Sequence, residues 1–172
     1  KATGVGKTTV MNAACSIWGN PENLVIRQVD TLHSKMNRGE LYHSLPWCID
    51  EITNIPPNVA SDLLYQFTDG MQRNRMSGSS NVERVRGRPW KLMAITTGNT
   101  SIIERVSMAK AMAKAEAQRV MECYVPDMKG HFQSKEETDT FNRELQENYG
   151  HAGIAFIQHV MQNLDEVRKL CL

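Results

Sequence analysis

The sequence predicts an α/β protein in which helices pack on both sides of a mainly parallel sheet, and three observations predict it. Short apolar runs alternate along the chain with longer segments of helical character, as in sheets whose parallel strands are joined by helices. A glycine-rich turn, Gly4 to Thr9, runs straight into an apolar helix. The apolar run 45–49 ends in the acidic pair Asp50 and Glu51, which is typical of a strand buried on both faces.

The first half of the chain carries three expected helices and two expected strands. Turn residues set several boundaries, because Gly and Pro end helices and a Pro pair favours a helix start. In chain order we expect a helix over 7–18, a short strand over 24–27, a helix over 30–42, a strand over 45–49 and a helix from Pro56 to Gly70.

The second half is expected to hold two more strands and a helical C-terminal segment. The polar stretch 72–90, with Ser and Gly at its centre, indicates a hairpin or an exposed loop, and Ser134 with Glu137 has the spacing of a capping box. After the loop we expect a strand over 90–97, a helix over 101–118, a strand over 119–125, a helix from Ser134 to Tyr149 and a helix over 152–170. This divides the chain into an expected core, 1–126, and a C-terminal helical segment, 127–172, that forms a lid or linker.

The composition is that of an ordinary folded domain. The chain has 172 residues, 41% of them hydrophobic and 23% charged, with a formal net charge of +1, which argues against a disordered chain. No run approaches the ~20 apolar residues that span a bilayer, so we expect no membrane partner. The four cysteines lie far apart without a C-x-x-C pair, which favours reduced thiols and no structural metal.

The stretch Gly-Val-Gly-Lys-Thr-Thr indicates a phosphate-binding loop. Glycines allow a tight turn whose N–H groups face a phosphate chain, and the following helix adds a partial positive charge. Lys7 is placed to reach the β- and γ-phosphates, and the Thr8 hydroxyl to ligate Mg²⁺. The alternative is a chance glycine-rich turn with both side chains solvated. The residues expected to bind ATP are Gly4, Val5, Gly6, Lys7, Thr8 and Thr9.

Polar side chains at two strand ends complete the expected site. Asp50 is expected to orient Mg²⁺ together with Thr8, while Glu51 positions the attacking water. Asn99 follows the next expected strand, at the sheet edge where ligands bind, and an amide there would hold the water or touch the γ-phosphate. The alternatives are a solvated acidic pair and an ordinary turn asparagine after Gly98.

Arg119 stands at the start of the last expected strand. An arginine from a neighbouring subunit can stabilise the charge of the phosphoryl-transfer transition state. Arg105 competes for this role, and a structural arginine at a helix–strand junction is the alternative reading.

The segment 72–91 is strongly basic. It holds six Lys and Arg residues against one acid, a local net charge of +5, which leaves −4 on the remainder of the chain. A segment with this positive charge attracts the phosphates of nucleic acid. The alternatives are a solvated loop or arginines that pair with acids of an adjacent subunit. The expected nucleic-acid-binding residues are Arg73, Arg75, Arg84, Arg86 and Arg88.

The order of these motifs resembles the AAA+ ATPases. G-V-G-K-T-T, L-P-W-C-I-D-E, I-T-T-G-N and Q-R-V-M-E-C-Y-V-P are similar to their phosphate loop, Walker B, sensor 1 and arginine-finger regions. Within that group the chain looks most like the helicase domains of phage, prophage and plasmid replication proteins, which include superfamily 3 helicases and a related family often joined to primase modules. The likeness covers residues 4–156.

The resemblance implies a three-layer P-loop ATPase that uses ATP and Mg²⁺ and assembles into a ring, usually a hexamer, with ATP between subunits. Lys7, Thr8, Asp50, Glu51 and Asn99 would act in one subunit and Arg119 in the next. The basic hairpin before sensor 1 would track single-stranded DNA in a replicative helicase. A fused or associated primase or polymerase module and a cytoplasmic location, in the bacterial host if phage-encoded, also fit this resemblance.

Two other functions fit the same residues. One is a non-motor AAA+ protein, such as a helicase loader or assembly factor, whose arginines bind a protein. The other is a monomeric phosphotransferase that needs no arginine from a neighbour. In each, the strand that feeds the phosphate loop is expected to precede Lys1, so the chain is expected to be a core cut from a larger protein.

Overall fold

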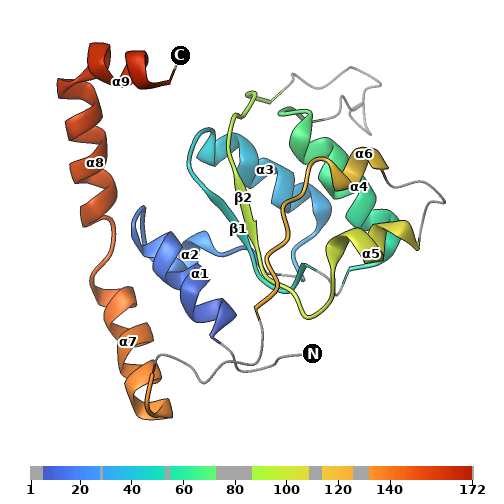
Figure 1. Ribbon diagram of the computed structural model, residues 1–172, viewed down its shortest axis with the longest axis horizontal. Coiled ribbons are helices and arrows are strands. Elements are labelled where there is room, and N and C mark those ends of the chain that lie inside the picture. Colours follow the sequence, from blue (N-terminus) through green and yellow to red (C-terminus); the bar gives the residue numbers. More distant parts are fainter. Residues whose placement is uncertain are drawn as a thin grey trace, which may run out of the picture.

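The computed structural model describes residues 6–27, 29–52, 55–72, 87–108, 114–125 and 132–171. Figure 1 shows a small sheet flanked by helices, with the C-terminal helices running along one side of it. The elements are, in chain order, α1 (Lys7–Ser16), α2 (Pro21–Leu24), α3 (Leu32–Tyr42), β1 (Trp47–Ile49), α4 (Pro57–Thr68), β2 (Ala94–Thr96), α5 (Ile102–Ser107), α6 (Lys114–Ala117), α7 (Lys135–Glu147), α8 (His151–Gln162) and α9 (Leu164–Leu170).

The sheet has two parallel strands, β1 and β2. Trp47 of β1 lies opposite Ala94 of β2, and Ile49 lies opposite Thr96. On the other side of β1, Ile26 forms an isolated parallel bridge with Ile49. Because the strands are parallel, their carboxyl ends share one edge of the sheet, and the polar residues that follow β1 and β2 meet there.

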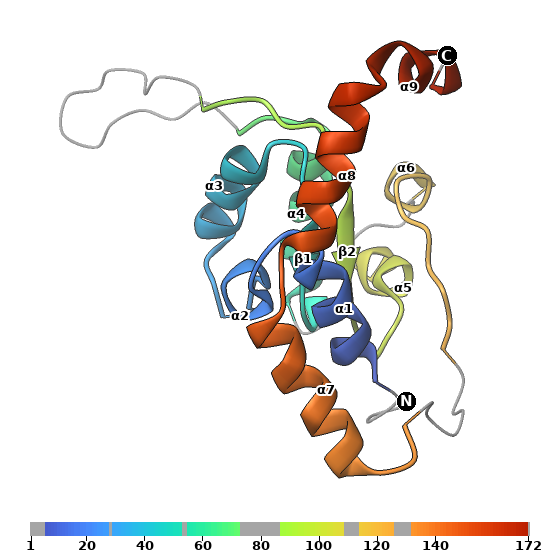
Figure 2. The same cartoon turned by 90° about the vertical axis from the view of Figure 1, so that its left-hand side faces the viewer.

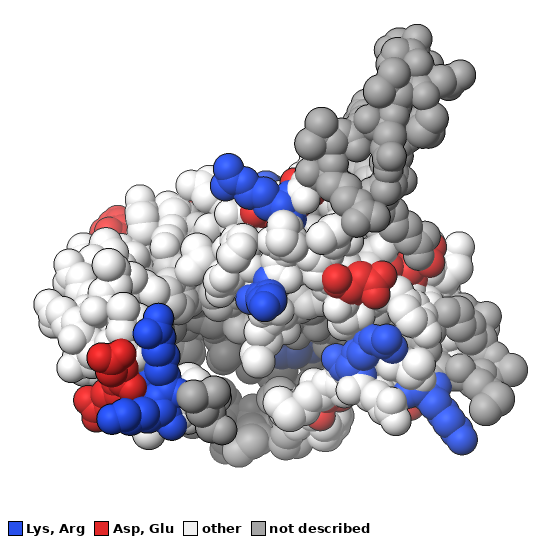
Figure 3. Space-filling model, turned by 90° about the horizontal axis from the view of Figure 1, so that it is seen from above, with Lys and Arg blue, Asp and Glu red and all other residues white. Residues whose placement is uncertain are grey.

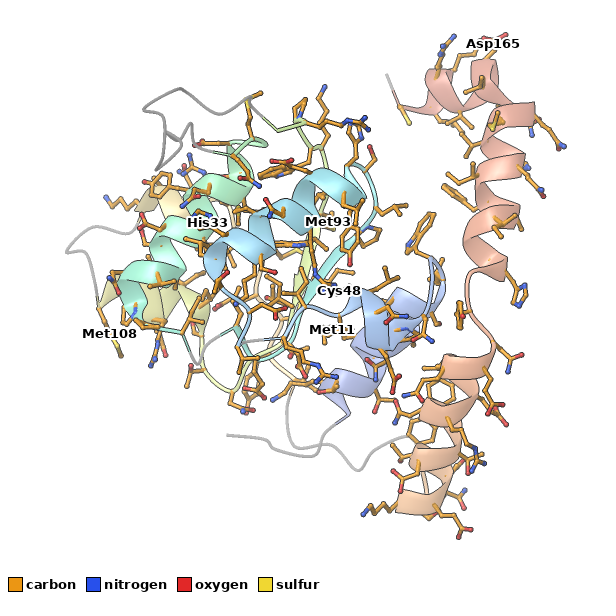
Figure 4. The ribbon with its side chains drawn as sticks, turned by 180° about the vertical axis from the view of Figure 1, so that it is seen from behind. Met11, His33, Cys48, Met93, Met108 and Asp165 are labelled. Carbon is orange, nitrogen blue, oxygen red and sulfur yellow. The ribbon has the colours of Figure 1, made fainter. Side chains whose placement is uncertain are left out.

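Helices cover both faces of β1. Trp47 and Ile49 pack into the main core with Met36 of α3 and Leu63 of α4, while Cys48, between them in the strand, packs against Met11 and Cys15 of α1 on the opposite face. Met11 and Cys48 lie side by side in Figure 4. Thus α1 is held against β1 by a buried apolar contact directly below the expected site.

Several predicted helices are confirmed, and their caps explain where they begin. The hydroxyl of Thr31 accepts a hydrogen bond from Ser34 N at 3.2 Å at the start of α3. The predicted start of α7 is confirmed, since Ser134 Oγ accepts from Glu137 N at 3.1 Å, while the Glu137 carboxylate accepts from Gln133 N, one residue before the cap, at 2.7 Å. These bonds satisfy amides that have no partner inside the helix.

The predicted strand over 24–27 is wrong. Its first residue ends the short helix α2, which the preceding turn starts: the Asn20 side chain accepts from Glu22 N at 2.8 Å, and Pro21 suits the first helical position. Of the predicted strand, Ile26 alone makes the bridge to β1.

The predicted strand over 119–125 is also wrong, because its residues run without regular structure. Met121 and Tyr124 are exposed at 90% and 83% of their surface, and Glu122 instead binds the N-terminus of α5, where its carboxylate accepts from Ile102 N at 2.5 Å and Ser101 Oγ at 2.7 Å. The predicted strand over 90–97 is shorter, since β2 comprises 94–96. Within the predicted helix over 101–118 the structure has α5 and α6, and 109–113 lie outside the described residues.

The C-terminal segment attaches to the body through α1. Asn142 of α7 donates to Thr9 Oγ1 at 3.4 Å, and at the start of α8 Gly153 N donates to Ile17 O at 2.9 Å. This approach requires glycine, since a Cβ on Gly153 would lie 2.5 Å from Ile17 O. Figure 2 shows α7 and α8 running past α1 in one continuous arm.

The apolar side expected on the last helix is largely exposed. The single helix expected over 152–170 is interrupted at Asn163, between α8 and α9. Ile154 and Met161 of α8 are exposed at 61% and 68%, although Phe156 makes an edge-to-face contact with Trp18 at 6.1 Å between ring centroids. Apart from Gly153 and Phe156, most of the apolar side of α8 is therefore not packed against the core.

Candidate functional site

The N-terminus of α1 carries the described part of the predicted phosphate loop. Gly6 precedes the helix with φ of +81°, a left-handed conformation that glycine adopts without the strain of a Cβ. Among the described residues no side chain caps this end of α1, so its first amides stay available to an anion. Lys7 and Thr8 are the first two residues of the helix, whereas Gly4 and Val5 lie outside the described residues.

The predicted acidic pair lies next to Thr8. Asp50 directly follows β1, and Thr8 Oγ1 lies 3.4 Å from each of its carboxylate oxygens. A hydroxyl and a carboxylate are oxygen ligands of the kind Mg²⁺ prefers. The predicted metal-binding residues, Thr8 and Asp50, are therefore brought together, and their chemistry fits the ion.

Glu51 has an unusual backbone. Its φ is +55°, in the left-handed region that costs a non-glycine residue of order 1 kcal/mol or more. Its backbone N–H donates to Thr97 Oγ1 at 3.2 Å, and the next amide, Ile52 N, donates to Thr97 O at 3.0 Å. These two bonds hold the turn that carries the carboxylate toward Asn99.

Asn99 joins Lys7 to Glu51. Lys7 Nζ donates to Asn99 Oδ1 at 2.7 Å. The amide nitrogen of Asn99 donates to the two carboxylate oxygens of Glu51 at 3.1 and 3.2 Å. A lysine, an amide and a carboxylate from three distant parts of the chain thus form one hydrogen-bonded group.

Thr97 belongs to this cluster and was not predicted. Its hydroxyl donates to Asp50 Oδ1 and accepts from Glu51 N. It follows the last strand pair, Ile49 with Thr96, and its backbone N–H donates to Ile49 O at 3.2 Å, which places its side chain beside Asp50. From the sequence I-T-T-G-N, Asn99 was predicted as a site residue and Thr97 was not.

A cavity of about 450 Å³ opens beside this cluster. It lies between the end of β2 and the extended segment 120–125, and Lys7, Asn99, Ser101, Glu122 and Tyr124 are among its lining residues. One wall is thus polar and belongs to the cluster, while the other includes side chains of the segment expected to form a strand.

The two candidate arginines contact their own chain. The Arg119 guanidinium lies 4.8 Å from the centroid of the Tyr65 ring and donates to Ala115 O at 2.7 Å. Arg105 donates twice to Ile55 O, each at 3.2 Å. None of these three hydrogen bonds joins an arginine to Lys7 or Glu51, and the trans-acting role stays a prediction.

Most of the predicted basic residues fall outside the described residues. These are Arg73, Arg75, Arg84 and Arg86, while Arg88 is described and exposed. On the face in Figure 3 the described Lys and Arg side chains are spread among uncharged ones, and both signs gather at one end. The predicted single-stranded DNA contact therefore rests on the sequence.

The cysteines divide into two kinds. All four are free; Cys15 and Cys48 are buried against one another, and Cys123 and Cys171 are exposed. In the described part of the chain no group of three or more His, Cys, Asp or Glu side chains could hold a metal ion. No helix in that same part is long and apolar enough to cross a membrane.

Comparison with known proteins identifies one family. Residues 1–87, half of the chain, match the domain of unknown function DUF927. The chain belongs to the DUF927 family. No curated protein and no solved structure matches it.

The DUF927 match covers one side of the cluster. It includes Lys7, Thr8, Asp50 and Glu51, on α1 and at the end of β1, and it stops before β2. Asn99 and Thr97 lie beyond the matched residues, so the DUF927 region supplies the lysine and the acids while the following segment supplies the amide and the hydroxyl that hold them.

Proposed function

We propose that this DUF927 chain is an ATP-hydrolysing ring motor, the domain of a replicative DNA helicase from a phage or mobile element that translocates on single-stranded DNA. The observation that carries the proposal is the convergence of Lys7, Thr8, Asp50, Glu51 and Asn99 around the N-terminus of α1 and the ends of two parallel strands. Parallel α/β sheets bind ligands at this edge, and helix N-termini bind phosphates.

In this proposal the loop and α1 hold the nucleotide. The amides around Gly6, with those of Gly4, Val5 and Thr9, receive the phosphates, and Lys7 exchanges its bond to Asn99 for one to the β- and γ-phosphates. Thr8 and Asp50 would hold Mg²⁺, which neutralises phosphate charge when bound.

Glu51 and Asn99 handle the attacking water. The Glu51 carboxylate orients the water and takes its proton, while the Asn99 amide keeps the carboxylate in place through its two hydrogen bonds. A general base of this kind contributes roughly 10²- to 10⁴-fold to a rate. Loss of Glu51 should therefore reduce the rate of hydrolysis much more than the affinity for ATP.

Ring assembly and DNA binding complete the proposal. Arg119, or Arg105 in its place, would reach the nucleotide of the neighbouring copy, and the arginines of segment 72–91 would hold single-stranded DNA through its phosphates. A fused or associated primase or polymerase module and a cytoplasmic location belong to the same proposal.

One observation favours a second candidate. Arg119 is engaged by Tyr65 and Ala115 of its own chain, as a structural arginine would be. A monomeric phosphotransferase needs no arginine in trans. The other alternative, a nucleotide-gated loader or assembly factor, would use its basic segment to bind a protein. These candidates keep the same nucleotide site and differ in oligomeric state and in the target of the basic segment.

The test is a binding and mass measurement on the full chain. We expect ATP to bind with Mg²⁺ by isothermal titration, and Lys7→Ala to weaken binding by roughly ten- to a hundredfold, because it removes a charge-assisted contact. Lys135→Ala, on the exposed start of α7, is the matched control. Mass measurement with an ATP analogue and single-stranded DNA separates a ring from a monomer, and no ATP binding by the unaltered chain overturns the proposal.

A further inference from the structure

The backbone pairing of β1 with β2 places Thr97 next to Asp50 and Glu51. The ladder between β1 and β2 continues past the last paired strand residues, since Thr97 N donates to Ile49 O at 3.2 Å and Ile52 N donates to Thr97 O at 3.0 Å. Side chains at matching positions of adjacent parallel strands lie on the same face. The Thr97 hydroxyl is therefore brought to the Asp50 carboxylate by backbone pairing.

The Thr97 hydroxyl uses its donor and its acceptor capacity on two different residues. It donates to Asp50 Oδ1 and accepts from Glu51 N at 3.2 Å. An ionised carboxylate can only accept and a backbone N–H can only donate, so the direction of both bonds is fixed. One side chain thus restrains the Asp50 carboxylate and the Glu51 backbone together.

Both restraints act on geometry that would otherwise relax. Glu51 holds a left-handed φ of +55°, and such conformations persist where the surrounding structure over-determines them. Asp50 lies within 3.4 Å of Thr8 Oγ1, the arrangement proposed to hold Mg²⁺. Loss of the Thr97 hydroxyl would free the carboxylate of Asp50 to rotate and leave the Glu51 amide without this acceptor.

We propose that Thr97 is the positioning residue of the acidic pair: its hydroxyl sets the Asp50 carboxylate for Mg²⁺ and fixes the turn that aims Glu51, without contacting nucleotide. This rests on the proposed ATPase function. It separates two steps, because Mg²⁺ use and hydrolysis depend on Thr97 while nucleotide binding in the absence of Mg²⁺ does not.

The experiment compares Thr97→Val, Thr97→Ser and Thr96→Val in the full chain. Valine has nearly the shape of threonine but neither donates nor accepts, serine keeps the hydroxyl, and Thr96 is an exposed neighbour on the opposite face of the strand. For Thr97→Val we expect kcat to fall about tenfold or more and the half-saturating Mg²⁺ concentration to rise severalfold. Metal-free binding of ATP should change less than about twofold, and Thr97→Ser and Thr96→Val should stay near the unaltered chain.

A second readout does not need ATPase activity. The Glu51 amide donates to Thr97 Oγ1, so its hydrogen exchange, followed by NMR, should accelerate about tenfold or more in Thr97→Val and stay slow in Thr97→Ser. If the unaltered chain shows no hydrolysis, the proposed function fails while this exchange still decides what Thr97 holds. Should Thr97→Val not fold, Thr97→Ala and Thr97→Ser provide the same comparison. An unchanged Glu51 exchange rate, an unchanged Mg²⁺ dependence in an active protein, or equal losses in Thr96→Val would overturn the proposal.

Discussion

The side-chain amide of Asn99 donates to both carboxylate oxygens of Glu51, at 3.1 and 3.2 Å. Its carbonyl oxygen accepts from Lys7 at 2.7 Å, which fixes the orientation of the amide because an ammonium group can only donate. Asn99 therefore connects the residue proposed to bind phosphate with the residue proposed to activate water. Substitution of Lys7 should weaken ATP binding, whereas substitution of Glu51 should slow hydrolysis.

Glu51→Gln should abolish hydrolysis and spare binding. The amide of glutamine cannot take a proton from water, so we expect the ATPase rate to fall about 100-fold or more, while the affinity for ATP changes little since Lys7 and Thr8 are intact. Phosphate release and ATP titration measure the two quantities. Glu147→Gln, an exposed acid at the end of α7, is the control, and full activity of Glu51→Gln would remove Glu51 from the mechanism.

Joint replacement of Arg84, Arg86 and Arg88 by Ala should weaken binding to single-stranded DNA. If each arginine contacts a phosphate, the slope of log affinity against log salt concentration should decrease by about 2. Fluorescence anisotropy with a labelled oligonucleotide over a salt series measures it. Replacing Arg143, Arg168 and Lys169 removes the same charge elsewhere. An unchanged affinity would favour the assembly factor, whose basic segment binds protein.

Lys35 should make stability depend on pH. Its side chain is buried, with 4% of the residue exposed, and burial lowers the pKa of its ammonium group, an effect that the Asp30 carboxylate partly opposes. Between that lowered pKa and the ordinary lysine value the unfolded chain binds more protons than the folded chain, so the free energy of unfolding rises with pH.

Lys35→Met should lose this alkaline rise. In the unaltered chain, below the lowered pKa, Lys35 is charged in both the folded and the unfolded state, and the free-energy cost of burying its charge is complete. This cost diminishes as the pH rises through the pKa of the folded state. Methionine carries no charge to bury. Urea unfolding of both proteins at a series of neutral to alkaline pH values measures the difference. Parallel curves for the two proteins would show that Lys35 does not titrate in this way.

The thiols should react in two phases. Cys123 and Cys171 are exposed, whereas a hydrogen bond with the Cys48 thiol, together with burial, raises the pKa of Cys15. The same hydrogen bond lowers the pKa of the Cys48 thiol, but Cys48 is buried, with 1% of the residue exposed, so the reagent cannot reach it. Because the thiolate is the reactive form, we expect Ellman's reagent to modify the two exposed thiols rapidly and Cys15 and Cys48 only on unfolding. Cys123→Ser with Cys171→Ser should remove the fast phase, and three or more fast thiols in the unaltered chain would contradict the described packing.

The sequence predicted best what local signals determine. The Ser134–Glu137 box gave the start of α7, and the apolar run before Asp50 gave β1, because capping bonds and burial on both faces leave clear residue patterns. The same reasoning grouped Lys7, Asp50, Glu51 and Asn99, because helix N-termini and parallel strand ends share one edge.

What failed depends on distant neighbours. Residues 119–125 have the composition of a strand, but Glu122 binds the start of α5 and the exposed side chains beside it have no described strand to pack with. The apolar residues of α8 have helical spacing, yet spacing does not reveal whether a surface covers them, and Ile154 is 61% exposed. Thr97 escaped notice because its role arises from the β1–β2 register, which no single segment encodes.

The left-handed backbone conformation of Glu51 lowers the stability of the fold at the residue proposed to activate water. Glycine would adopt that conformation with about 1 kcal/mol less strain, so Glu51→Gly relieves backbone strain in the folded state while it removes the carboxylate. At position 51 the proposed role of the carboxylate and the stability of the fold are thus in conflict. A selection or design scheme that rewards thermal stability alone would move this chain away from the chemistry proposed for it.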